Sequence, residues 1–139
     1  MAEHVSRWSK DPSTQTGAVI VRPDRTVASV GYNGFPRGVQ DSSNRLGDRD
    51  KKYDMIVHCE MNAIISAQEP LYGYTLYCFP FTCCARCAAH VIQAGITRVV
   101  SPRPSGDVLS RWSDSLGTAR QMFDEAGVSV EEDAYYVSN

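Results

Sequence analysis

The sequence contains no apolar run close to the ~20 residues that a membrane-spanning helix needs. Its first ten residues, MAEHVSRWSK, hold no apolar segment of the kind found in secretory signal peptides. Lysine and arginine form no long cluster, and the formal net charge is −2, so the basic surface typical of polynucleotide binders is missing. We therefore expect a cytoplasmic protein, of a bacterium or of the host of a virus, that binds neither membranes nor nucleic-acid polymers.

The cysteines do not suit a disulfide framework. There are five, an odd number, and all lie between residues 59 and 87. Reduced thiols or a metal site explain them better than secretion does. A chain of 139 residues buries about 68% of its unfolded surface, enough for a core without disulfides. We expect a single domain over residues 1–139.

Hydrophobic periodicity predicts an α/β fold. A short helix at residues 2–9 precedes an antiparallel hairpin, with strands at 17–21 and 26–31. Further strands at 75–79, 97–101 and 128–130 alternate with helices at 59–68, 84–94 and 114–126. That alternation is typical of parallel strands joined by right-handed crossovers. Residues 35–53 show neither period, and so long a loop is uncommon in a compact domain unless it binds something.

A histidine and a Cys-x-x-Cys pair, each at the start of a predicted helix, indicate a metal site. Cys84 and Cys87 are three residues apart, so they share a helix face near an N-terminus that favours thiolates. Two thiolates and the neutral imidazole of His58 suit zinc, and three protein ligands leave the fourth position for water. Glu60 follows His58 closely enough to stand beside that position and take a proton from the water.

Each half of this pattern also has an ordinary explanation. His58 and Glu60 can simply cap and charge a helix start, and a Cys-x-x-Cys pair can be redox-active. The order, separation and helix-opening positions of the two halves agree with one site, which favours zinc. Cys83 is a rival thiolate, but only Cys84 has a cysteine three residues on.

The sequence resembles the zinc-dependent cytidine deaminase superfamily, whose members carry His-x-Glu and Cys-x-x-Cys motifs. Within it the chain is most similar to bacterial or phage deoxycytidylate (dCMP) deaminases. The segments that carry the likeness are SKDPSTQTGAVIV (9–21), GYNGFPRG (31–38), HCEMNAI (58–64), TLYCFPFTCCARCA (75–88), VIQAGITRVV (91–100) and RWSDSLGTARQMFDEAGV (111–128). The resemblance implies a three-layer αβα sandwich around a mixed five-stranded sheet. It also implies hydrolysis of dCMP to dUMP and ammonia, which supplies dUMP for thymidylate synthesis.

The same resemblance implies roles for individual residues. Zn²⁺ is bound by His58, Cys84 and Cys87, while Glu60 shuttles protons. Asn33 grips the sugar hydroxyl and Phe81 packs on the pyrimidine, although a turn residue and a core residue explain these two equally well. The backbone N–H of Cys59 and the backbone C=O of Thr82 read the cytosine edge. Cys83 is a departure, because the family usually has proline there.

Basic residues near the site are candidates for the 5′-phosphate. We rank Lys10 and Arg49 first, and the other candidates are Ser13, Arg45, Lys51 and Lys52. A solvated surface charge explains any one of them as well. Tyr53 can close over the sugar or simply pack.

Relatives in the family are commonly hexamers, activated by dCTP and inhibited by dTTP, with Mg²⁺ accompanying the triphosphate. The resemblance therefore implies a homo-oligomer with a regulatory site bordered by Tyr32, Gly34, Phe35 and Arg37. A plain turn explains the same glycine-rich segment.

Two classes of alternative function are open: deamination of another substrate, and a zinc site without catalysis. The same reaction on dCTP, 5-modified dCMP, deoxycytidine or tRNA adenosine is one class of alternative, and a non-enzymatic zinc module is the other. A second, structural zinc is not expected, because the remaining histidines and cysteines show no convincing ligand spacing; they are His4, His90, Cys59, Cys78 and Cys83.

Overall fold

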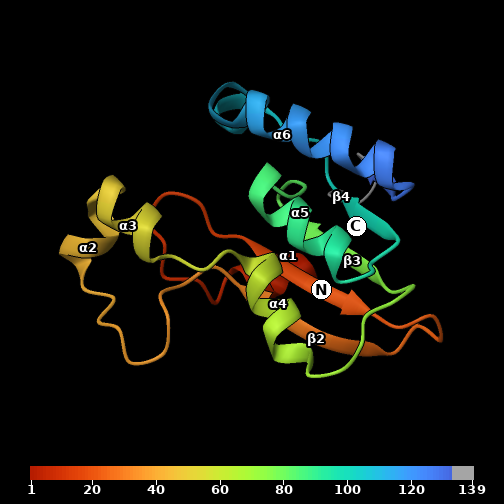
Figure 1. The fold of residues 1–139 in the computed structure, drawn as a ribbon. Helices are drawn as coiled ribbons and strands as arrows, with labels where there is room; N and C mark the ends of the chain where they lie inside the picture. The colour runs from red at the N-terminus through yellow and green to blue at the C-terminus, as the bar shows by residue number, and fades with distance from the viewer. Residues whose placement is uncertain (133–139) are drawn as a thin grey trace.

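The computed structural model describes residues 1–132, so the last seven residues of the predicted domain lie outside it. One sheet of five strands has the order β2-β1-β3-β4-β5 (Figure 1). The strands are β1 (Gly17–Val21), β2 (Val27–Tyr32), β3 (Thr75–Phe79), β4 (Arg98–Ser101) and β5 (Ser129–Glu132). β1 pairs antiparallel with β2 and β3, whereas β3, β4 and β5 run parallel. The predicted mixed sheet with its starting hairpin is confirmed.

Helices lie on both faces of this sheet. Successive strand residues point to opposite sides, so the apolar residues of β1 pack against helices on each face. Ala18 and Ile20 join the main core beneath α4 (Cys59–Ala67) and α5 (Ala85–Gln93). Val19, between them, packs instead with Ala2 and Val5 of α1 (Ala2–Ser6). The long helix α6 (Gly106–Ala126) packs against α5. Within residues 1–132, no helix has the length and apolar character to cross a membrane.

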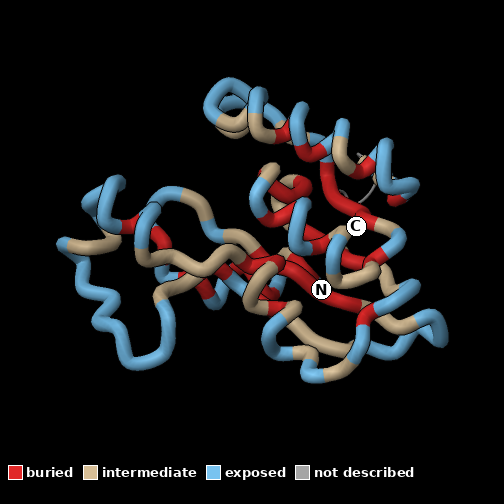
Figure 2. The backbone as a smooth tube through the Cα atoms, in the orientation of Figure 1, coloured by how far each residue is buried: buried red, intermediate tan, exposed pale blue. Residues whose placement is uncertain are grey.

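Two short helices interrupt the segment that we predicted as a continuous loop. They are α2 (Ser43–Gly47) and α3 (Arg49–Met55), which lie to one side of the sheet in Figure 1 and are largely exposed in Figure 2. Each begins at a side-chain cap: Ser42 accepts a hydrogen bond from the Arg45 N–H, and Asp48 accepts one from the Lys51 N–H. Helices this short and polar carry no detectable apolar period, which is why the pattern missed them.

The bounds of two other helices also differ from the prediction. α6 begins at Gly106 instead of residue 114, and α1 ends at Ser6 instead of residue 9. The first turns of α6 consist mostly of exposed residues, so the apolar stripe that marks a helix begins later than the helix does.

Gly31 allows the backbone of α4 to approach β2 unusually closely. A Cβ at this position would lie 2.4 Å from the Ala63 backbone nitrogen and 2.4 Å from the Cys59 carbonyl oxygen. The Ser29 hydroxyl adds a 2.6 Å hydrogen bond to the Ala63 carbonyl. Backbone contact, rather than a layer of side chains, therefore sets the distance between α4 and the sheet.

Candidate active site

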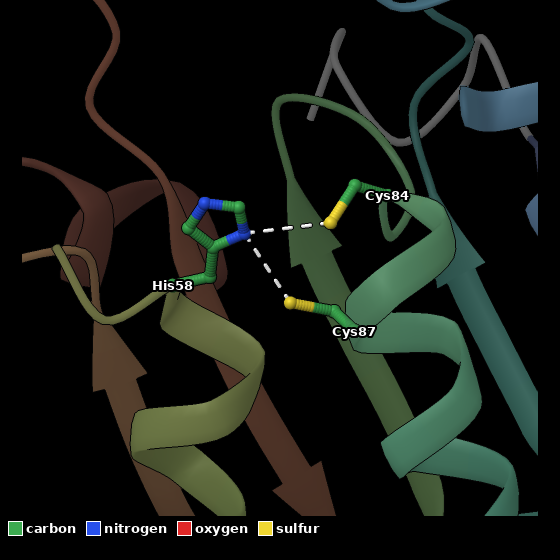
Figure 3. Close-up of side chains that lie close together, drawn as sticks. All are labelled: His58, Cys84 and Cys87. Atoms are coloured by element: carbon green, nitrogen blue, oxygen red, sulfur yellow. Dashed lines mark hydrogen bonds between the residues drawn. The ribbon is translucent and has the colours of Figure 1, made fainter. Parts of the chain in front are cut away.

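The starts of α4 and α5 face each other and bring three metal-binding side chains together (Figure 3). The Nδ1 atom of His58 lies 3.5 Å from Cys84 Sγ and 3.3 Å from Cys87 Sγ. A tetrahedral zinc with Zn–S near 2.3 Å and Zn–N near 2.0 Å separates such atoms by about 3.5 Å. His58 stands at the N-cap of α4 but makes no capping hydrogen bond through its side chain. The donor set thus fits zinc, and simple helix capping does not account for this ring.

Hydrogen bonds among the three groups shift the pKa of each one. A hydrogen bond from Cys87, reinforced by one from His58, lowers the pKa of Cys84 to about 4. The pKa of Cys87 is raised because it donates to Cys84, and the pKa of His58 is raised by its hydrogen bond to the same sulfur. Cys84 also stands at the N-terminus of α5, where the helix dipole favours a thiolate ligand.

A cavity opens beside this cluster, and Glu60 lines it together with His58 and Cys84. Glu60 is only 6% exposed, and this burial raises the pKa of its carboxyl. A buried carboxyl with a raised pKa is suited to taking a proton from water and returning it. The site therefore combines a metal-binding triad with a proton carrier at the end of an accessible cavity.

A family model describing the cytidine and deoxycytidylate deaminase zinc-binding region matches residues 1–102. The chain belongs to this deaminase family. The match includes the whole metal-binding triad and Glu60, and the family predicted from the two motifs is confirmed.

Individual relatives of this deaminase agree with the family match. An uncharacterized deaminase in the luxG 3′ region of Aliivibrio fischeri is 47% identical over 130 residues, covering 94% of this chain and 86% of that protein. Human deoxycytidylate deaminase is 35% identical over 133 residues, covering 89% of this chain and 70% of the human protein. The crystal structure of dCMP deaminase from cyanophage S-TIM5 in complex with dCMP and dUMP has a TM-score of 0.74 at 23% identity, covering 95% and 90% of the two chains. That structural likeness supports the fold.

Three of the predicted substrate-contacting residues, Asn33, Tyr53 and Phe81, line the cavity of this deaminase. The Asn33 amide is also occupied within the protein: its Oδ1 accepts from the Thr16 N–H at 2.8 Å, and its Nδ2 donates to the Thr14 carbonyl at 2.9 Å. Asn33 has no left-handed backbone, so its conformation does not require a special turn residue. Cys59 and Thr82 are buried and do not line the cavity with their side chains.

Our first choices for the phosphate-binding residues lie outside the cavity. Neither Lys10 nor Arg49 lines the cavity. The Lys10 ammonium forms an ion pair with Asp41 at 3.0 Å, and Arg49 is exposed on α3. Of the secondary candidates, Ser13 and Lys52 do line the cavity, whereas Arg45 and Lys51 do not. Helix α3 turns Lys52 inward and leaves Arg49 and Lys51 outside, an arrangement that reading 35–53 as a loop did not predict.

Sequence reasoning missed Arg111 and Trp112, which α6 contributes to the cavity. The Arg111 guanidinium donates to the Thr14 hydroxyl at 3.3 Å, and the Trp112 ring lies edge-on to Tyr53 with centroids 6.3 Å apart. The segment RWSDSL did carry part of the family resemblance. Placing the helix start at 114 left both residues outside any element, and no role was predicted for them.

A second recess adjoins the catalytic cavity. Three of the predicted regulatory residues, Tyr32, Gly34 and Phe35, line it, and Arg37 does not. Asp11 and Asn33 border both spaces. The predicted regulatory segment thus lies next to the catalytic cavity.

Proposed function

We propose that this chain catalyses the hydrolysis of dCMP to dUMP and ammonia. The observation that carries the proposal is the His58–Cys84–Cys87 triad beside a cavity that is lined by His58, Cys84 and the buried Glu60. Relatives that carry the name deoxycytidylate deaminase support the choice of substrate. In this role the protein supplies dUMP for thymidylate synthesis.

In the proposed reaction Glu60 carries the proton. Zinc held by His58, Cys84 and Cys87 supplies a Lewis acid that makes water easier to deprotonate. Glu60 accepts a proton from the water as the water oxygen attacks C4 of the cytosine ring. Glu60 passes that proton to N3 of the ring and then transfers the remaining hydroxyl proton to the amino group, which leaves as ammonia while the water oxygen becomes the uracil carbonyl. Burial of Glu60 favours this exchange because its pKa is raised.

The remaining cavity residues position the nucleotide. We assign the pyrimidine ring to Phe81 and the sugar hydroxyl to Asn33, both of which line the cavity. The backbone N–H of Cys59 and C=O of Thr82 read the cytosine edge. Tyr53 and Trp112 form the outer wall near the sugar.

For the 5′-phosphate we propose Arg111 in place of Lys10 and Arg49. Within residues 1–132 no carboxylate pairs with Arg111, whereas the charge of Lys52 is matched by Asp11 at 3.1 Å. A cavity-lining guanidinium without a carboxylate partner among residues 1–132 is well suited to a phosphate dianion.

Replacing Arg111 tests this assignment. Because hydrogen bonds to charged groups contribute about 1.5–3 kcal/mol, Arg111→Ala should raise KM for dCMP about 10- to 100-fold and leave deoxycytidine turnover unchanged. Lys10→Ala is the matched control and should leave both substrates unaffected. An equal loss on deoxycytidine would show that Arg111 acts on the fold instead of on the phosphate.

Glu60→Gln tests the catalytic role. The variant should keep its zinc and lose about 10²- to 10⁴-fold in activity, the usual contribution of a general acid–base group. Glu125→Gln, at an exposed position of α6, is the control. Full activity in Glu60→Gln would point to a non-enzymatic zinc module, and loss of zinc would make Glu60 a ligand.

Substrate preference separates the remaining alternatives. The zinc-loaded protein should release ammonia from dCMP faster than from deoxycytidine, dCTP, 5-modified dCMP or tRNA. Equal or faster release from tRNA would reject a mononucleotide substrate.

Regulation, assembly and location are proposals that rest on the family resemblance. They comprise a hexamer, activation by dCTP and inhibition by dTTP with Mg²⁺ at the segment of Tyr32, Gly34, Phe35 and Arg37, and a cytoplasmic location. Sedimentation and initial rates with each triphosphate test the first two.

A further inference from the structure

A second group of metal-binding side chains lies beside the zinc triad. The sulfur atoms of Cys78 and Cys83 and a carboxylate oxygen of Glu60 all lie within 4.8 Å of one another. Cys78 comes from β3, Cys83 immediately precedes the N-cap of α5, and Glu60 sits in the first turn of α4. Folding therefore brings together residues whose spacing along the sequence gave no sign of a site.

The geometry of this group is close to what a tetrahedral ion requires. Bonds of about 2.3 Å to sulfur and 2.1 Å to oxygen place ligand atoms roughly 3.6–3.8 Å apart. The three atoms need to close by about 1 Å at most to reach that spacing, which small side-chain rotations provide. Two thiols and a carboxylate form a donor set suited to a soft or borderline divalent ion.

Burial and access also favour an ion over three unrelated core residues. Cys78 and Cys83 are fully buried, so an ion bound there would lose nearly all its water and depend on these three ligands. Glu60 lines the catalytic cavity, so one of the three ligands is reached through it. The two thiols are hydrogen-bonded to each other in the core, and the buried Glu60 carboxyl beside them adds a third ligand group that apolar packing does not require.

We propose that Cys78, Cys83 and Glu60 form a second, inhibitory metal site for a thiophilic divalent ion such as Cd²⁺ or Zn²⁺ in excess. Binding releases the thiol protons to solvent and ties the Glu60 carboxylate to the ion. Glu60 is then unable to carry protons for the reaction. Inhibition rests on the proposed function of Glu60, whereas binding of the second ion does not.

Cadmium titration of the zinc-loaded protein tests the proposal. Metal content per chain is measured after gel filtration, together with the ultraviolet thiolate-to-cadmium absorption and the rate of dCMP turnover. The wild type should retain its zinc, take up one cadmium, and lose about 10²-fold or more in rate because a general acid–base group is sequestered.

Variants of the buried cysteines separate this site from the zinc triad. Cys78→Val removes one sulfur while filling the space, and it should bind no second ion and keep its activity in cadmium. Cys78→Ala makes the same test if the valine variant does not fold. Cys59→Ala is the control: this thiol is also buried but lies outside the three-atom group, so second-ion uptake should match the wild type.

Several results would overturn the proposal. They are the absence of a second ion in the wild type, equal uptake by Cys78→Val, and cadmium that merely exchanges for zinc. A second ion bound with full activity would remove Glu60 from the ligand set. If the protein never turned over dCMP, the proposed function would fail, yet the metal count would still decide whether the second site exists.

Discussion

The buried ion pair between Lys52 and Asp11 gives a sharp prediction for stability. The two side chains are 8% and 5% exposed, and the Lys52 ammonium lies 3.1 Å from an Asp11 oxygen. Lys52→Met keeps most of the apolar stem but leaves the Asp11 carboxylate buried without its cation. Removing one partner of a buried pair costs about 3–5 kcal/mol.

The remaining contacts of Asp11 place the expected loss at the lower end of that range. Its carboxylate still accepts hydrogen bonds from the Ser13 and Thr14 N–H groups and from the Asn33 amide. We therefore expect the free energy of unfolding to fall by about 3 kcal/mol. For 139 residues, with an unfolding entropy near 2.1 cal/mol/K per residue, Tm should drop by about 10 °C.

Thermal and urea unfolding of the zinc-loaded protein, followed by circular dichroism, measure this loss. Lys51→Met, the exposed neighbour on α3, is the control and should change stability by no more than about 0.5 kcal/mol. Combining Lys52→Met with Asp11→Asn should cost less than the two single changes together, by about 2 kcal/mol. Strict additivity, or a loss under about 1 kcal/mol in Lys52→Met, would refute an energetic coupling between these charges.

Two further predictions concern how the metal site is held. Gly31→Ala should destabilise the protein by about 3 kcal/mol or more and weaken zinc binding, because α4 must move away from β2. Gly34→Ala is the control, since a Cβ there meets only a side-chain atom at 3.9 Å. Unfolding and zinc-competition assays should show no loss in this control. As pH is lowered, apparent zinc affinity should fall by about tenfold per pH unit for each proton that zinc displaces from the triad, and a chelator competition that shows no pH dependence would exclude these ligands.

The sequence was most informative where chemistry and local pattern coincide. His58, Glu60 and the two ligand cysteines were predicted from residue type and helix-opening position, and the structure places the triad and Glu60 in one site. The sheet was predictable for a similar reason, since strands with alternating or continuous apolar residues have short-range signatures.

The cavity wall was less predictable because it depends on tertiary contacts. Arg111 reaches the site through the exposed first turns of α6, which have no apolar stripe, and Lys52 is turned inward by a short capped helix. Cys78 and Cys83 lie close to Glu60 because folding brings β3 and α5 into contact with α4. No spacing rule along the chain encodes such proximity.

The loop that forms one wall of the cavity is held by its own hydrogen bonds before any nucleotide arrives. The Asn33 side chain hydrogen-bonds to the Thr14 carbonyl and the Thr16 N–H, and the Asp11 carboxylate accepts a 2.8 Å hydrogen bond from the Ser13 N–H. The conformational entropy of this wall is therefore lost during folding and not on ligand binding, which otherwise costs about 0.5–1.5 kcal/mol per immobilised side chain. A nucleotide meets a preorganised surface here, so association should resemble rigid docking, without a slow ordering phase.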